Sequence, residues 1–173
     1  MAVWASCCTW RAISTAPVCI AWAANTGGKI DTVHAQSARL ALDYGTDDTT
    51  SMLFKFRSNA TAYLSTVIAT AETWRLQVLG SKGWMEVGDV QHLTTWTLRT
   101  CFFDPAQPYV HPQPQLITFP DTSTERTELE HFADAVKAKR PLAVAGGDEE
   151  HNVTVLEAIL ASAAVGVTVK VQG

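Results

Sequence analysis

The sequence predicts an α+β fold of two layers (α/β two-layer), with an open, mainly antiparallel sheet and helices packed on one of its faces. Two observations support this prediction. Residues 47–87 read as consecutive strands joined by tight turns, because apolar residues alternate and turn-forming residues separate the runs. The last third of the chain instead has two stretches whose apolar residues repeat at the spacing of a helix.

The composition is that of one globular domain. A chain of 173 residues buries about 70% of its unfolded surface, and 47% of these residues are hydrophobic. No apolar run reaches the 18 residues that a membrane span needs. The 13 basic residues are scattered and the net charge is −4, so neither a membrane nor a nucleic acid is an expected partner.

Residues 1–26 differ in character from the remainder of the chain. They contain three Trp, three Cys and one charged residue, with no period of 2 or 3.6. Ala21-Trp22-Ala23 resembles a signal-peptide cleavage site, but the positive N-terminal region is missing and Pro17 interrupts the apolar run. We therefore expect residues 1–26 to be an atypical, poorly packed leader, as a frame change or false start codon would produce, and residues 27–173 to be the domain.

The four cysteines indicate reduced thiols. They form no CxxC pair, and no histidine spacing completes a zinc pattern around them. Reduced thiols are typical of the cytoplasm, which is the expected location. The cysteines are Cys7, Cys8, Cys19 and Cys101.

A first strand is expected over residues 29–42. Its inward-facing residues would be Ile30, Val33, Ala35 and Leu40. The acid-rich residues 43–48 come next as a turn. Neighbours in an extended strand point to opposite faces, so Asp47 and Asp48 cannot act as a paired acid and base there, and we expect a solvated turn.

The strands of residues 47–87 are expected to continue one after another. The alternating apolar residues of these strands are Met52, Phe54 and Phe56, then Ala62, Leu64, Val67 and Ile68, then Trp74, Leu76, Val78 and Leu79. The turn Gly80-Ser81-Lys82-Gly83 leads into another strand with Trp84, Met85 and Val87. Residues 91–103 and 115–119 are two further strands, separated by a proline-rich loop.

Two helices are expected after these strands. The first has an apolar repeat of Leu129, Phe132, Ala133 and Val136, with Ser123 or Thr124 as its N-cap, and it ends before Pro141. The second has an expected apolar stripe of Val153, Leu156, Ile159, Leu160 and Ala163 and ends at Gly166. Residues 167–171 form a short last strand.

From about Gly28 to Val171 the sequence resembles the C-terminal domain of the Gfo/Idh/MocA oxidoreductases, the family of glucose-fructose oxidoreductase and inositol dehydrogenase. Order and spacing over some 140 residues carry the resemblance. The matching residues are 30–35, 47–49, Leu53, Phe54, Phe56, 59–61, Leu64, 79–87, 128–136 and 140–142, then Asp148, His151, 155–158, Ser162, Ala163 and Val169.

The resemblance implies an open sheet that supports the substrate and forms much of the subunit interface, and NAD or NADP as the cofactor of the full-length family. The family's other half is a Rossmann domain. This sequence has no G-x-G-x-x-G after a strand, no Glu-Lys-Pro element, and no Asp…His motif before the first strand of the domain. No cofactor is therefore expected to bind this chain alone.

No catalytic, cofactor-binding or metal-binding residues are predicted. The five histidines lie in separate segments without metal-ligand spacing, and no G-x-S-x-G nucleophile elbow occurs. The candidates for facing a substrate are Arg39, Tyr44 and Trp74, which are expected near strand ends, and a structural role is the favoured alternative for each.

The expected function is that of the substrate-side and oligomerisation domain of an NAD(P)-dependent dehydrogenase acting on a sugar, polyol or similar hydroxy compound. The chain would be truncated and not catalytic alone, so whether it is an enzyme stays open. It would form a homodimer or higher homo-oligomer through the open sheet face. The alternatives are a stand-alone binding or scaffold module, and a subunit completed in trans by a Rossmann chain.

Overall fold

The structure is a computed structural model, and it describes most of the chain from residue 28 onward together with one short earlier strand. The described residues are 9–13, 28–43, 45–71, 73–89, 97–104, 106–107, 110, 112–120, 122–140 and 149–172.

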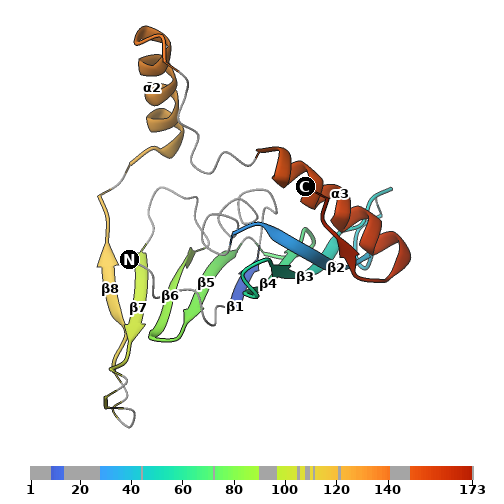
Figure 1. The fold of residues 1–173 in the computed structure, drawn as a ribbon, viewed down its shortest axis with the longest axis horizontal. Coiled ribbons are helices and arrows are strands. Elements are labelled where there is room, and N and C mark those ends of the chain that lie inside the picture. The colour runs from blue at the N-terminus through green and yellow to red at the C-terminus, as the bar shows by residue number, and fades with distance from the viewer. Residues whose placement is uncertain are drawn as a thin grey trace.

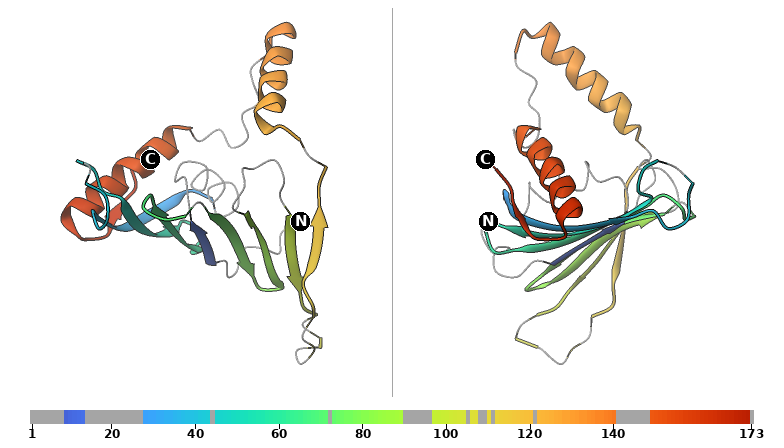
Figure 2. Two further views of the ribbon diagram at one scale, coloured as in Figure 1. Left: turned by 180° about the vertical axis from the view of Figure 1, so that it is seen from behind. Right: turned by 90° about the vertical axis from the view of Figure 1, so that its right-hand side faces the viewer.

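One nine-stranded sheet and two helices make up the described part (Figure 1). The strand order is β8-β7-β6-β5-β1-β4-β3-β2-β9. Both helices lie on the same side of the sheet (Figure 2), which confirms the predicted α+β fold with an open, mainly antiparallel sheet. The elements are β1 (Thr9–Ile13), β2 (Ile30–Ala38), β3 (Thr49–Phe56), β4 (Thr61–Val67), β5 (Trp74–Gly80), β6 (Gly83–Asp89), β7 (Thr97–Phe102), β8 (Gln115–Thr118), α2 (Thr124–Lys137), α3 (Glu149–Val165) and β9 (Val169–Lys170).

Strand β1, which falls within the leader expected over residues 1–26, lies inside the sheet. It pairs in parallel with β4 and antiparallel with β5. In the sheet, β1 separates β4 from β5, which follow each other along the chain. Backbone hydrogen bonds to the strands on both sides hold β1 in the sheet. These bonds do not require side chains that alternate between apolar and polar, so a strand can form without that pattern.

The core lies on the face of the sheet that the helices cover. On β3, Met52, Phe54 and Phe56 are buried, and Phe54 stands opposite Val33 on one side and Ala62 on the other. This alternation confirms the predicted inward residues of the central strands. Leu40, which was expected to face inward, is instead 74% exposed. Val67 ends β4 as predicted, and Ile68 lies just after the strand.

Helix α3 packs on β2, and two buried side chains hold it there. The Ile30 N–H donates to His151 Nε2 at 3.0 Å, and the Ala35 N–H donates to Ser162 Oγ at 2.9 Å. Ser162 Oγ also donates to the Val167 carbonyl at 2.6 Å. Strand β9 pairs with β2 only at two residues, so these side chains bond backbone N–H groups that β9 does not reach.

The buried face of α3 is rotated from the predicted one. Val155, Ala158 and Ile159 are buried together with the polar His151 and Ser162. Of the predicted stripe, Val153 and Leu160 are instead exposed. The helix turns its two polar residues inward because they bond the edge of β2, and apolar residues occur on both of its faces.

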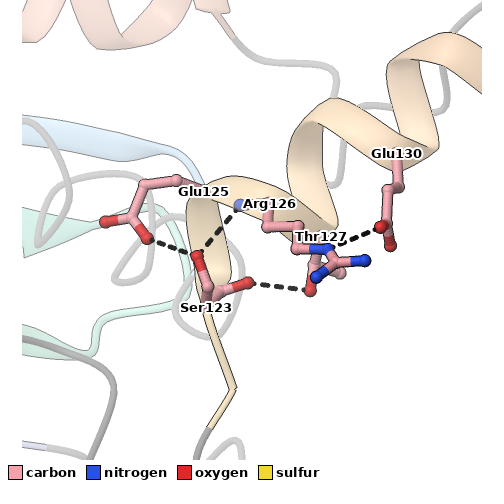
Figure 3. Close-up of polar contacts among 5 residues, drawn as sticks. All are labelled: Ser123, Glu125, Arg126, Thr127 and Glu130. Carbon is pink, nitrogen blue, oxygen red and sulfur yellow. Dashed lines mark hydrogen bonds and ion pairs between the residues drawn. The ribbon is translucent and has the colours of Figure 1, made fainter.

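Helix α2 stands apart from the sheet and from α3 (Figures 1 and 2). Ser123 is its N-cap, as predicted, and its Oγ accepts from the Arg126 N–H at 3.2 Å (Figure 3). The Thr127 hydroxyl donates to the Ser123 carbonyl at 3.0 Å, and the Arg126 Nε–H donates to Glu130 Oε1 one turn on at 2.8 Å (Figure 3). The helix ends at Lys137, before the predicted Pro141.

Candidate functional site

The predicted substrate-facing residues fall at one end of the sheet where the structure describes them. Arg39 comes directly after β2 and is exposed, and Trp74 is the first residue of β5. Tyr44 lies outside the described residues. In the strand order, β2 and β5 are four positions apart, which corresponds to about 19 Å. The structure therefore places Arg39 and Trp74 at the same end without bringing them together.

Asp48 fixes the loop that carries Arg39. Its carboxylate oxygens accept N–H bonds from Leu40 at 3.1 Å and from Ala41 and Leu42 at 2.8 Å. The Thr49 hydroxyl donates a further bond at 2.9 Å. Several donors converging on one carboxylate form a nest, which holds the loop in one conformation.

The same bonds determine the charge state of Asp48. The N–H groups of Leu42, Ala41 and Leu40 and the Thr49 hydroxyl hold the pKa of this carboxyl well below 3.8, and burial, which raises the pKa, opposes them only in part. Asp48 is 2% exposed, whereas Asp47 is exposed. The expected solvated turn is therefore wrong for Asp48, because loop N–H groups replace water around its carboxylate.

The face of the sheet opposite the helices carries a cluster of charges. Glu86, in the middle of β6, lies 2.7 Å from Arg99 Nη1 on β7 and 3.7 Å from Arg75 Nε on β5. The Arg99 guanidinium is 5.7 Å from the centre of the Trp84 ring. Two cations around one carboxylate leave a net positive charge, and we call this group the open-face cluster.

The rest of the open face mixes apolar and hydroxyl groups. Leu53 is 55% exposed, and its neighbours include Tyr63, whose hydroxyl lies 3.3 Å from Ser51 Oγ. Ser51 Oγ lies 3.4 Å from Ser65 Oγ. Of these groups, aromatic and arginine side chains are enriched at protein interfaces. This set was not predicted from the sequence, although opposite charges on neighbouring strands were an available signal for the Glu86 cluster.

A small pocket lies between α3 and β9. Its volume is about 170 Å³, below the roughly 300–1,000 Å³ of most small-molecule sites. Its lining includes Glu157, Lys170 and Thr154. The described residues therefore offer a small groove of mixed polar and apolar lining here rather than an enclosed ligand cavity.

The described residues do not fit a nicotinamide dinucleotide. A dinucleotide needs a glycine-rich turn that leads from a strand into a helix N-terminus, where N–H groups meet the phosphates. In the described part, α2 has Glu125 in its first turn and Glu150 stands at the start of α3. Negative side chains at these ends repel a phosphate.

The described ranges also offer few groups for metal binding or for catalysis by histidine or cysteine. They contain no group of three or more His, Cys, Asp or Glu residues that could hold a metal ion. His151 is buried against β2, and the Cys101 thiol is free and donates weakly to the Pro112 carbonyl. No helix in this part of the chain is long and apolar enough to cross a membrane.

Residues 20–86 match the GFO/IDH/MocA C-terminal domain family model. The aldose-aldose oxidoreductase from Caulobacter crescentus, solved with glycerol, is 20% identical, and the match covers 95% of this chain and 55% of that one with a TM-score of 0.72. The WlbA dehydrogenase from Bordetella pertussis, solved with NADH and UDP-GlcNAcA, is 15% identical over 96% of this chain and 54% of its own, with a TM-score of 0.68. Levoglucosan dehydrogenase, solved with NADH and levoglucosan, is 14% identical over 96% and 58%, with a TM-score of 0.75.

These comparisons confirm the predicted resemblance to the C-terminal domain of the Gfo/Idh/MocA oxidoreductases. The family match begins earlier than the predicted start near Gly28, and the shared fold extends over nearly the whole chain. The chain spans little more than half the length of the solved structures that it matches. No curated protein matches it in sequence.

Proposed function

We propose that this Gfo/Idh/MocA-type C-terminal domain is the substrate-side and oligomerisation domain of an NAD(P)-dependent oxidoreductase acting on a sugar, polyol or similar hydroxy compound. One observation carries the proposal: the sheet and α3 have the fold of the C-terminal part of sugar oxidoreductases, and one sheet face is left uncovered by helices. The dinucleotide would bind outside this chain's described residues, so the chain would not be catalytic alone. Its free Cys101 thiol supports a cytoplasmic location.

In this proposal the loop of residues 39–48 holds the substrate. Hydroxyl groups of a sugar need donors and acceptors at fixed positions, and a loop clamped by Asp48 provides a fixed position for Arg39. A guanidinium donates several hydrogen bonds in a fixed plane, which suits a polyol with neighbouring hydroxyls. Arg39 would orient the substrate and take no part in moving hydride or proton.

The open face would pair with a second copy of the chain. It presents the exposed Leu53, the hydroxyl row and the open-face cluster on one surface. A layer with helices on only one side leaves its other side to be covered, and a second copy of the same face is the simplest cover in a symmetric dimer.

Two measurements test these roles separately. For the interface, we expect Leu53→Lys to lower the mass of the assembly measured by light scattering. The control Leu160→Lys, an exposed leucine on α3, should leave the mass unchanged. Equal masses for the native chain and Leu53→Lys at all concentrations would reject the open face as the interface.

For the substrate, glycerol and levoglucosan are titrated into the native chain while thermal unfolding is followed. We expect stabilisation that Arg39→Ala reduces and that Arg126→Ala, on the distant α2, does not. No stabilisation by either compound, or oxidation of either compound by the chain with NAD alone, would contradict the proposed role.

A further inference from the structure

Helix α2 carries an apolar stripe that the described part of the chain leaves uncovered. Leu129, Phe132 and Val136 recur at i, i+3 and i+7, which places them on one side of the helix. They are 68%, 55% and 61% exposed. The helix stands away from the sheet and α3 in both views of Figure 2, so this stripe differs from the buried face of α3.

A helix of this length needs a packed face. Helices shorter than about 15 residues are marginal in water, because most of their stability comes from packing an amphipathic face. The Ser123 cap and the Arg126–Glu130 pair stabilise the first turns of α2 (Figure 3), but both are exposed and local. The stripe is therefore the part of α2 that a partner would stabilise most.

The charges of α2 indicate which partner fits. The first half, residues 125–130, has three glutamates and one arginine, and the end, residues 134–140, has three cations and one aspartate. Glu125 stands in the first turn, and Lys139 comes directly after the C-cap Ala138. The helix is thus acidic at its N-terminal end and basic at its C-terminal end.

We propose that α2 packs antiparallel against α2 of a second copy of this chain, stripe to stripe, across a two-fold axis near Phe132. This orientation brings Leu129 toward Val136 of the second copy. It also brings Glu125 toward Lys139 of the second copy, twice by symmetry. A parallel pair would instead place like charges together at both ends.

Further exposed apolar residues lie directly before α2 in the chain. β8 is the outer strand of the sheet. Its residue Ile117 pairs with Leu98 and therefore points away from the open face, and it is 41% exposed, while Phe119, just after the strand, is 60% exposed. Two short helices alone bury little area compared with a stable interface, so these residues supply area that the helix pair lacks. This surface is separate from the open sheet face proposed above, and each can form without the other.

The test uses opposite charges in two variants. Both are made with Leu53→Lys, which removes the open-face contact, and self-association is measured by sedimentation. Glu125→Lys places two lysines against each other at both ends of the pair, and Lys139→Glu places two glutamates there. We expect each variant to associate about tenfold more weakly than the Leu53→Lys parent. A mixture of the two variants should regain the parent's affinity, because every end contact then joins a lysine to a glutamate.

The remaining outcomes separate this proposal from its alternatives. Phe132→Asp should make the Leu53→Lys parent monomeric, whereas Leu160→Asp on α3 should not, and circular dichroism shows whether α2 keeps its helicity. A monomeric Leu53→Lys parent at 100 µM would overturn the proposal and leave the open face as the interface. Weakened variants that fail to associate when mixed would overturn it too, since local helix destabilisation would then explain the loss.

Discussion

The buried hydroxyl of Ser162 offers a sharp test of how α3 is held on the sheet. Ser162 and Ala35 are both 0% exposed, and Ser162 Oγ joins the Ala35 N–H to the Val167 carbonyl. In Ser162→Ala both backbone groups lose this partner. Their costs differ, because residue Val167 is 55% exposed and its carbonyl can turn to water, whereas the Ala35 N–H stays buried.

The expected loss of stability can be worked out from that difference. A buried N–H group left without a partner costs about 1–3 kcal/mol, and a solvated carbonyl costs little. We therefore expect Ser162→Ala to lower the free energy of unfolding by about 2 kcal/mol. With a urea slope of about 2 kcal/mol per molar, the midpoint should fall by about 1 M with an unchanged slope.

Urea unfolding followed by circular dichroism measures this change. The matched control is Ser51→Ala on the open face, whose contacts with Tyr63 and Ser65 are 3.3 and 3.4 Å long and should cost less than about 0.5 kcal/mol. Hydrogen exchange of the Ala35 amide should also speed up in Ser162→Ala. A loss no larger than that of the control, with Ala35 still protected, would refute this account of α3 docking.

Three further predictions concern single side chains. Gly83→Ala should cost about 2 kcal/mol or more in urea unfolding, because Gly83 has φ +140° and a Cβ there would overlap the Cys101 carbonyl. Asp48→Asn should be less stable than the native chain at pH 7. Because folding lowers the pKa of Asp48, the stability advantage of the native chain over Asp48→Asn is fully present above the ordinary pKa of 3.8. That advantage is lost as pH falls below 3.8, so the stability curves of the native chain and of Asp48→Asn should converge in acid. Arg99→Ala should cost about 1 kcal/mol and Arg75→Ala less than about 0.5, because Arg99 makes the 2.7 Å contact with the shared carboxylate and both arginines are partly solvated.

Each of these predictions has a control. Gly45→Ala meets no neighbouring atom and should be nearly neutral. Asp47→Asn removes an exposed carboxylate next to Asp48 and should leave the pH profile unchanged. Equal losses at Gly83 and Gly45, parallel pH curves for Asp48→Asn and the native chain, or equal costs at the two arginines would contradict the respective structural explanations.

The regular elements were predictable because local periodicity determines them. Alternation on β3 correctly placed Met52, Phe54 and Phe56 in the core, and the Ser123 cap and the stripe around Phe132 correctly located α2. The order of motifs along the chain also carried the resemblance that the family match and the shared fold confirm. These features depend on neighbours in the sequence, so the sequence alone reveals them.

Only the tertiary structure decided which groups distant in sequence meet. It inserts β1 between β4 and β5, and it buries Asp48 under the N–H groups of its own loop. It also turns Ser162 toward β2, so that the buried face of α3 is not its most apolar one. In each case a backbone hydrogen-bonding group needed a partner, and the cost of leaving such a group buried and unpaired outweighs the side-chain pattern.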